Sequence, residues 1–233
     1  MKHSKVPPCT TCKNKNKLFC GLNNDDRAYL SVNKGSSSYK SGQVVFNEKS
    51  QPQGLYCIYN GKVKVSKLGA DGKEQIVRFF GTGEVIGYRA LLSNTSYNAT
   101  ATAIEDCEIC HISKSVFMNR LQENSSLAYN VIQLLSENLK DSEDKLLSVT
   151  QKSVRERVAQ ALLLLKTRFG LEEDEATLPV LLTRREIGEI ACITTETTIR
   201  TMSDFKKESI LEFNKKKIKI IDMDRLISIA GID

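Results

Sequence analysis

The sequence predicts an α+β chain: an N-terminal antiparallel β-roll, then one long helix, then a C-terminal winged helix-turn-helix. Three observations predict it. Short β-forming runs alternate with Asn-Gly and Asp-Gly turn signals in the first half of the chain. Apolar residues then recur at alternating spacings of four and three, which is typical of a helix with one narrow apolar stripe. Two short capped helices finally precede a lysine-rich hairpin. We therefore place a cysteine-containing segment at 1–25, the β-roll domain at 26–123, the long helix at 124–150 and the last domain at 151–233.

The composition is that of an ordinary globular protein, with 40% hydrophobic and 27% charged residues. No stretch approaches the roughly 18 consecutive apolar residues of a membrane span, and the N-terminus lacks the apolar core of a secretory signal. We therefore expect a cytoplasmic protein with no membrane partner, whose seven cysteines are reduced, metal-bound or redox-sensing. The net charge of +6 mildly favours a polyanionic partner. An enzyme is not expected, because only two histidines are present and no P-loop or dinucleotide-binding fingerprint occurs.

Within the roll, turn signals separate the expected strands. Asn60-Gly61 and Asp71-Gly72 favour type I′ hairpin turns, because both central residues of such turns need positive φ. The segment "TATAIEDCEICHI" is expected to supply one further strand. Cys57 and Cys192 lie in apolar strand and turn contexts, so we expect them to be small core residues.

The long helix is predicted from a row of weakly polar and apolar residues that we call the seam: Ala128, Ile132, Leu135, Leu139, Ser142, Leu146 and Val149. The residues between them are mostly polar, so this stripe needs a partner. Packing against the chain's own roll is one alternative, and we favour self-association as a homodimer about a two-fold axis. No seam position carries a charge, which predicts a dimer that forms without waiting for a signal.

The C-terminal region contains a helix-turn-helix pattern. Thr183 followed by Glu186 forms a capping box that begins a helix ending at Ala191. Thr194 can cap a second helix from about residue 195 to 208. The apolar positions expected to pack the two helices together are Ile187, Ile190, Ile193, Ile199, Met202 and Phe205. The preceding acidic stretch "GLEEDEATLP" is expected to be a solvated loop.

The second of these helices is predicted to contact double-stranded DNA. Thr195, Glu196 and Arg200 lie near its N-terminal end, where they would face base edges in a major groove. Arg200 can donate two hydrogen bonds to guanine, and Glu196 can accept one from cytosine. Backbone phosphates would lie near the hairpin lysines Lys215, Lys216, Lys217 and Lys219, and Thr183 is a further candidate DNA-binding residue. Two alternatives are that the lysines form a solvated turn and that this domain serves protein contacts.

The run "CTTCKNKNKLFC" places Cys9, Cys12 and Cys20 ahead of any segment that could fold a core. These thiols could be metal ligands, a disulfide pair with one thiol left over, or unrelated to any site. A zinc site is also permitted, because four-cysteine zinc sites are made from such spacings.

The order of roll, long helix and winged helix-turn-helix resembles the CRP/FNR family of bacterial transcription regulators over nearly the whole chain. The segments that carry the resemblance are "GLYCIYNGKVKVSKLGADGKEQIVRFFGTGEVIG" and "LTRREIGEIACITTETTIR", in which Glu196 and Arg200 match the family's pair on the recognition helix. The resemblance implies a jelly roll like that of cyclic-nucleotide-binding domains and a homodimer on a palindromic operator. It also implies RNA polymerase as a partner, and activation more than repression.

Within that family the sequence is more similar to the FNR branch. This likeness implies a [4Fe–4S] cluster held by Cys9, Cys12 and Cys20 together with Cys110 on the last strand of the sensor domain, so that oxygen is the signal. Cys107 is an alternative to Cys110. The gap from Cys12 to Cys20 is longer than is usual in FNR proteins, and the uncharged seam also departs from an oxygen-gated dimer.

Family members that bind cyclic nucleotides carry an Arg-Ser pair for the phosphate. Here Tyr97-Asn98 stand at those positions, while Glu84 is retained for the ribose contact. A desolvated phosphate without a partner would be unfavourable, so tight cAMP binding is not expected. The alternative function is a regulator without a metal whose roll binds another small-molecule effector.

Overall fold

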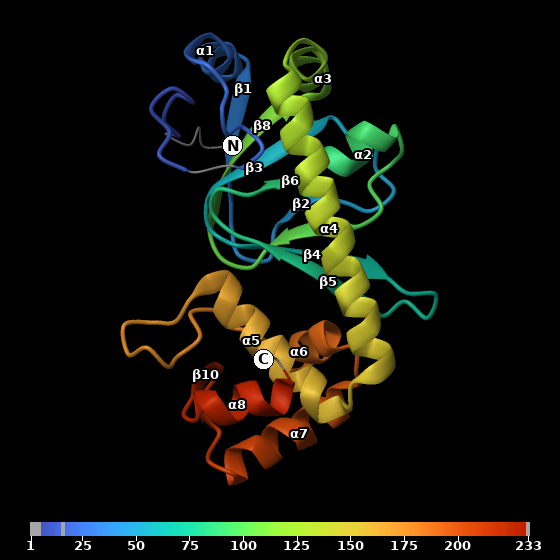
Figure 1. Ribbon diagram of the computed structural model, residues 1–233, viewed down its shortest axis with the longest axis vertical. Coiled ribbons are helices and arrows are strands. Elements are labelled where there is room, and N and C mark those ends of the chain that lie inside the picture. The colour runs from blue at the N-terminus through green and yellow to red at the C-terminus, as the bar shows by residue number, and fades with distance from the viewer. Residues whose placement is uncertain (1–5, 15–16, 232–233) are drawn as a thin grey trace. The chain divides into compact units, whose positions relative to one another are not determined.

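The computed structural model describes residues 6–14 and 17–231 (Figure 1). They form two compact units. The first comprises residues up to Gly72 together with Val77–Lys140, and the second comprises Lys73–Ile76 together with residues from Asp141 onward. Within the described ranges, no helix combines the length and apolarity that crossing a membrane requires.

The first unit is built around the predicted antiparallel β-roll. Its two four-stranded sheets have the orders β1-β8-β3-β6 and β2-β7-β4-β5. The strands are β1 Lys34–Tyr39, β2 Val44–Phe46, β3 Gly54–Asn60, β4 Val63–Leu68, β5 Glu74–Phe80, β6 Val85–Ile86, β7 Thr100–Ala103 and β8 Cys107–Ser113. The helices that accompany them are α1 Asn24–Val32, α2 Tyr88–Ser93, α3 Lys114–Glu123 and the long α4 Ser125–Gln151.

Two details of the roll prediction are wrong. The segment "TATAIEDCEICHI" forms two strands, β7 and β8, which lie in different sheets. The two turns are not type I′, because only the glycines have positive φ, at 105° for Gly61 and 74° for Gly72. Asn60-Gly61 joins β3 and β4, which also lie in different sheets, so it turns a corner instead of closing a hairpin. A Cβ on Gly61 would lie 2.5 Å from the Cys107 sulfur, so glycine is required there for space as well as for φ.

The sheet β1-β8-β3-β6 is buried on both faces. Successive side chains of a strand point to opposite faces. In β8, Cys107 and Ile109 therefore face the interior of the roll, where they pack with Ile58. Ile112 faces the other side and packs with Leu55 in a second core cluster, formed with the N-terminal segment and the helices. This second core is the part of the fold that positions the cysteine-rich segment.

Helix α1 was not predicted from the sequence. It begins after Asn23, whose side-chain oxygen accepts a hydrogen bond from the backbone N–H of Asp26 at 2.7 Å. Leu30 of this helix is buried in the second core together with Leu18 and Leu22 of the preceding segment. The chain before β1 is therefore packed onto the outer face of the sheet.

Helix α4 carries two apolar stripes. Leu127 and Val131 are buried in the second core, and Asn138 continues this stripe by donating a hydrogen bond from Nδ2 to the Tyr88 hydroxyl. The residues one position further along belong to the seam and point away from this core. A helix with buried residues on one side and apolar residues on another presents a second surface for packing.

The second unit contains α5 Val154–Phe169, α6 Arg184–Ala191, α7 Thr195–Lys207, β9 Leu211–Asn214, β10 Lys217–Ile220 and α8 Met223–Ala230. A capping box of Ser153 and Glu156 begins α5. The antiparallel pair β9–β10 is the predicted hairpin wing. Phe205, Met202 and Leu162 are fully buried, so α5 and α7 share one apolar core.

Candidate nucleic-acid interface and cysteine pocket

The helix-turn-helix consists of α6 and α7. The Thr183 hydroxyl accepts a hydrogen bond from the Glu186 N–H at 3.2 Å, and the Glu186 carboxylate accepts one from the Thr183 N–H at 2.9 Å. This is the predicted capping box. The Thr194 hydroxyl accepts from the Thr197 N–H at 3.2 Å and so caps α7 as expected. Both helices therefore begin where local hydrogen bonding fixes them.

One of the six residues expected to pack the two helices together does not do so. Ile187, Ile190, Met202 and Phe205 are buried and Ile193 is partly buried, whereas Ile199 is 52% exposed. Thr198 of α7 is buried in its place.

Thr198 can lie inside because its hydroxyl donates to the Thr194 carbonyl at 2.9 Å and is thereby satisfied. The close approach depends on Gly188 of α6, where a Cβ would lie 2.6 Å from the Thr198 hydroxyl. The solvent-facing side of α7 therefore carries an isoleucine that the sequence alone did not reveal.

The predicted base-reading residues lie on the open side of α7. Glu196 and Arg200 are exposed, and Thr195 is partly buried at the first helical position. Hydrogen bonds from its own backbone N–H and from the Thr194 hydroxyl hold the pKa of the Glu196 carboxyl below its usual range. Residues four apart lie on one helical face, so Glu196, Ile199 and Arg200 form a continuous acidic, apolar and basic surface.

Among the described residues, two of the four wing lysines form ion pairs with the acidic stretch and two do not. Lys215 and Lys216 form the turn, are exposed, and make no ion pair within the described part of the chain. Lys217 donates to both oxygens of Glu172 at 2.8 Å, and the Lys219 ammonium lies 3.3 Å from a carboxylate oxygen of Asp174.

The acidic stretch is therefore not simply solvated, because it holds two wing lysines. Hydrogen bonds from Thr177 hold the pKa of the Asp174 carboxyl far below its usual value, so Asp174 stays charged beside the wing.

The seam is open to solvent along most of its length. Ile132, Leu139 and Leu146 are 59%, 62% and 64% exposed, and Ala128 alone among the seven is partly buried. The alternative that these side chains pack against the chain's own roll is therefore not what the structure has. A contiguous exposed apolar stripe of this kind marks an interaction surface.

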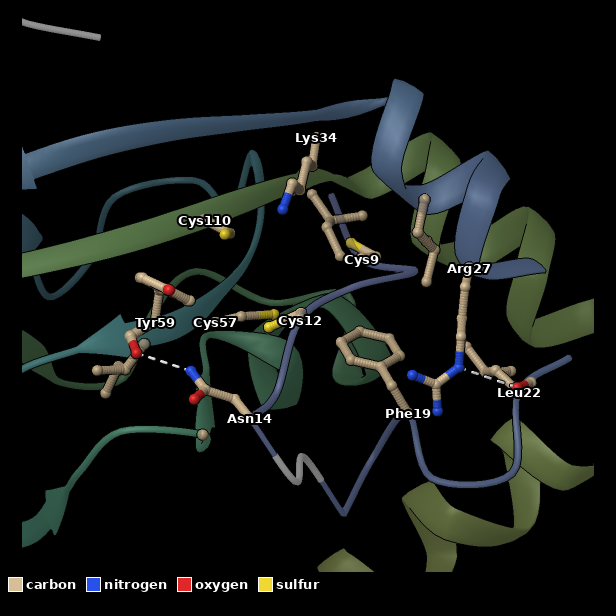
Figure 2. A pocket seen from close by; sticks show the side chains of 14 residues that line it. Cys9, Cys12, Asn14, Phe19, Leu22, Arg27, Lys34, Cys57, Tyr59 and Cys110 are labelled. Atoms are coloured by element: carbon tan, nitrogen blue, oxygen red, sulfur yellow. Dashed lines mark hydrogen bonds between the residues drawn. The ribbon is translucent and has the colours of Figure 1, made fainter. Parts of the chain in front are cut away.

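A pocket of about 80 Å³ lies between the N-terminal segment and the outer face of the sheet (Figure 2). Four thiols line it: Cys9 and Cys12 from the segment, Cys57 from β3 and Cys110 from β8. Figure 2 shows the side chains of Cys12 and Cys57 pointing toward one another. Cys57 does pack against the second core, as expected of a small core residue, but the pocket that it also lines was not predicted.

The other two candidate ligands lie elsewhere. Cys20 is exposed and is not among the residues that line the pocket, and its carbonyl accepts a hydrogen bond from the Asn130 side chain at 2.7 Å. The Cys107 sulfur lies on the opposite face of the sheet, where it contacts the carbonyls of Lys62 and Glu105 at 3.3 and 3.2 Å. Cys107 is thus directed away from the pocket.

The walls of the pocket are apolar and cationic. Burial raises the pKa of the Cys9 and Cys110 thiols, and the nearby Lys34 ammonium partly opposes this rise. Burial, followed by the neighbouring Cys110, raises the pKa of Cys57 further. Figure 2 shows the Lys34 amino group pointing between Cys9 and Cys110, and Arg27 lines another wall. The pocket therefore combines thiols with positive charge.

The donor set fits a thiolate-bound metal centre, since four sulfur ligands suit an iron–sulfur cluster or zinc. Among the described residues, no three of the Cys, His, Asp and Glu side chains are grouped closely enough to hold a metal ion as they stand. The thiols of the pocket would therefore have to converge on binding, which is expected of sites whose ligands become ordered by the metal.

The interior of the roll is filled at the position expected for a cyclic phosphate. The Tyr97 ring stacks on Phe46 with ring centroids 4.0 Å apart, and its hydroxyl donates to the Gly54 carbonyl at 3.0 Å. Glu84 accepts a hydrogen bond from the Gly81 N–H at 2.7 Å. An aromatic side chain thus occupies space and offers no positive charge there.

Comparison with known proteins identifies both domains. Residues 36–124 match the cyclic nucleotide-binding domain, and residues 156–229 match the Crp-like helix-turn-helix domain. The chain is 29% identical over 196 residues to the fumarate and nitrate reduction regulatory protein of Vibrio cholerae, covering 83% of this chain and 77% of that protein. It is 27% identical over 199 residues to the transcriptional activator protein FnrA of Stutzerimonas stutzeri, covering 82% and 79%.

Solved structures agree with these matches. FixK2 from Bradyrhizobium japonicum superimposes with a TM-score of 0.74 at 26% identity, covering 84% of this chain and 96% of that one. A CRP/FNR-family transcriptional regulator from Thermus thermophilus shares the fold, with a TM-score of 0.72 at 20% identity, covering 84% and 98%. From its two matched domains, its relatives and its fold, we conclude that this chain belongs to the CRP/FNR family of DNA-binding transcription regulators.

Proposed function

We propose that this chain acts as a homodimer that binds a palindromic DNA site and responds to oxygen or redox state through a cysteine-ligated iron–sulfur cluster. The observation that carries the DNA-binding part is the exposed face of α7. Glu196 and Arg200 lie four residues apart on a helix whose N-terminus is fixed by Thr194. Side chains at the start of a recognition helix are those that reach base edges in the major groove.

The chemistry of the α7 face suits direct readout of bases. Arg200 can donate a bidentate pair to guanine, and Glu196, kept ionised at neutral pH, can accept from cytosine. Ile199 lies beside Arg200 and is exposed, so it offers an apolar contact to a thymine methyl group. Lys215 and Lys216 at the exposed tip of the wing would contact phosphates and so set the register on the duplex, with Thr183 and Thr195 as further DNA contacts.

The dimer is proposed to form through the seam. Its exposed apolar residues need a partner, and a second copy offers the same stripe about a two-fold axis. Two recognition helices related by that axis would read half-sites about 34 Å apart, one turn of the DNA helix. Because the seam carries no charge, we expect the dimer to persist without a signal.

The sensing part is proposed for the cysteine pocket. Cys9, Cys12 and Cys110 line the pocket and are three of the four ligands that the sequence predicted. A bound iron–sulfur cluster would supply the reactivity toward oxygen, while the chain's own residues hold it beside α1 and the second core. A cyclic nucleotide is not proposed as the effector, because the Tyr97 side chain fills the place expected for the cyclic phosphate and carries no positive charge to bind it. RNA polymerase is the further partner proposed, through activation of transcription.

DNA binding is tested by fluorescence anisotropy with a palindromic duplex at two salt concentrations. Binding through phosphates must weaken steeply as salt rises. A binding curve that does not respond to salt would exclude this mode. The cluster is tested on protein purified without oxygen: a broad visible absorption that bleaches in air supports it, and colourless, zinc-loaded protein contradicts it.

A further inference from the structure

We propose that Cys57 is the fourth cluster ligand in this chain, and that Cys20 is not a ligand. This inference rests on the proposed cluster and concerns which of the chain's thiols would hold it. The observation behind it is that the pocket gathers Cys9, Cys12, Cys57 and Cys110, whereas Cys20 lies outside it and is exposed.

The strand register sets Cys57 beside Cys110. These two residues are direct partners in the antiparallel pair β3–β8. Direct cross-strand partners point to the same face, with Cβ atoms about 4.5–5.5 Å apart. That face is the one that carries Leu55 and Ile112 beneath the N-terminal segment. The sheet therefore offers a pair of neighbouring thiols.

The N-terminal segment supplies the second pair and is tied down above the first. The Cys9 N–H donates to the Ser31 hydroxyl at 3.1 Å, and the Asn14 side chain donates to the Tyr59 carbonyl of β3 at 2.7 Å. Lys34 at the start of β1 donates to the Pro7 carbonyl at 2.6 Å. These bonds hold both cysteines of the C-x2-C pair over the strand that carries Cys57.

Cys20 is held away from this arrangement by its neighbours. Leu18 is 1% exposed and Leu22 is 6% exposed, so buried anchors lie two residues before and two residues after it. The Asn130 side chain also donates to the carbonyls of Leu18 and Cys20, at 3.1 and 2.7 Å. Phe19 and Leu22 line the pocket but Cys20 does not, whereas Cys57 does. Moving Cys20 into the pocket would have to displace this segment from its two hydrogen bonds to Asn130.

Charge in the pocket agrees with a fully thiolate-ligated cluster. Four thiolates give such a centre a net negative charge, and buried negative charge needs positive partners. Lys34 and Arg27 both line the pocket and supply them. Figure 2 shows the Lys34 amino group between Cys9 and Cys110, so it lies where the charge of the centre would develop.

The test compares serine variants at three cysteines after anaerobic reconstitution with ferrous iron and sulfide. Cys57→Ser is expected to lose most of the bound iron, sulfide and visible absorption, while Cys20→Ser keeps the wild-type content. Cys107→Ser is the matched control, because it removes another buried thiol from the same sheet on the opposite face. Loss of iron in Cys20→Ser together with retention in Cys57→Ser would overturn the inference.

A measurement on the unmodified chain guards against a variant that fails to fold. The reconstituted protein is treated with iodoacetamide without oxygen, and each cysteine is assayed by peptide mass spectrometry. We expect Cys20 to be alkylated at the same rate with and without iron, and Cys57 to be alkylated more slowly in the iron-loaded protein than after a chelator has removed the iron. Protection of Cys20 with alkylation of Cys57 would refute the assignment. A wild-type chain that takes up no iron would instead refute the proposed cluster itself.

Discussion

Replacing Lys215 and Lys216 by alanine together is expected to weaken DNA binding at every sequence and to flatten its salt dependence. Both side chains are exposed at the tip of the wing, where they can approach phosphates. Replacing Lys217 is expected to change binding less, because Glu172 already neutralises it in the free protein through two contacts of 2.8 Å. We therefore expect alanine substitutions at adjacent wing lysines to weaken DNA binding by unequal amounts.

The magnitude follows from counterion release. Each phosphate contact adds about 0.9 to the slope of log affinity against log salt. Two lysines in each protomer of a dimer make up to four contacts, so the double variant should lose up to about 3.6 from that slope. Between 50 and 200 mM salt, the gap between wild type and variant should then narrow by a factor on the order of 100.

The assay is fluorescence anisotropy on one labelled duplex at several salt concentrations, with Lys67→Ala as the control for loss of an exposed positive charge on the roll. Glu172→Gln supplies the opposite test, since freeing Lys217 should steepen the slope and tighten binding. An unchanged slope in the double variant would refute the placement of the wing at the phosphates. A Lys217→Ala effect as large as that of the double variant would refute the role of Glu172.

Three further predictions test the recognition helix, the seam and the charge network of the second unit. Arg200→Ala should weaken binding by about 1–3 kcal/mol and relax the preference at one base pair, as measured on a library of operator variants; an unchanged preference contradicts the reading of guanine. Leu139→Glu should convert the dimer to monomer in sedimentation velocity, because it places like charges across the seam; Leu68→Glu, at an equally exposed leucine on β4, should leave the dimer intact, and a dimer that survives both changes would place the interface elsewhere. Glu208→Gln should lower stability at neutral pH and not at acid pH. The Arg155 guanidinium lowers the pKa of Glu208 in the folded state, so its contribution is complete above the unfolded value of about 4.3 and is lost as the pH falls through the folded value. Urea unfolding at neutral and acid pH measures this, and an equal difference at both would contradict it.

The features that were predicted from the sequence depend on residues close together in the chain. The Thr183–Glu186 capping box spans three residues, and the seam repeats every three or four. Their geometry is set by helix periodicity alone, so neither needs knowledge of distant contacts. The fold class followed from the order of such local patterns.

Several features that depend on distant contacts were not predicted. The Asn60-Gly61 signal is the same whether the chain closes a hairpin or turns a corner between sheets, and the pairing of β3 with β8 decides between these. The sequence pattern places Ile199 among the residues that pack the two helices together, because apolar residues usually are buried. The neighbouring Thr198 is inside because Gly188 leaves room for it and the Thr194 carbonyl satisfies its hydroxyl. Successive residues of a helix are rotated by about 100° around its axis. Burying Thr198 in place of Ile199 therefore puts an isoleucine on the surface that would face DNA.

Cys57 shows why an apolar sequence context does not distinguish a core residue from a thiol that lines a pocket. The sheet β1-β8-β3-β6 is covered on both faces, so the β3 side chains from Leu55 to Ile58 have apolar neighbours whichever way they point. Which face a thiol joins depends on strand parity, and which thiol it meets depends on register, here Cys57 opposite Cys110. Cys107 differs from Cys110 by three positions and therefore faces the other side. For the proposed site, the resemblance therefore indicates Cys9, Cys12 and Cys110, whereas Cys57 is identified only once β3 is paired with β8.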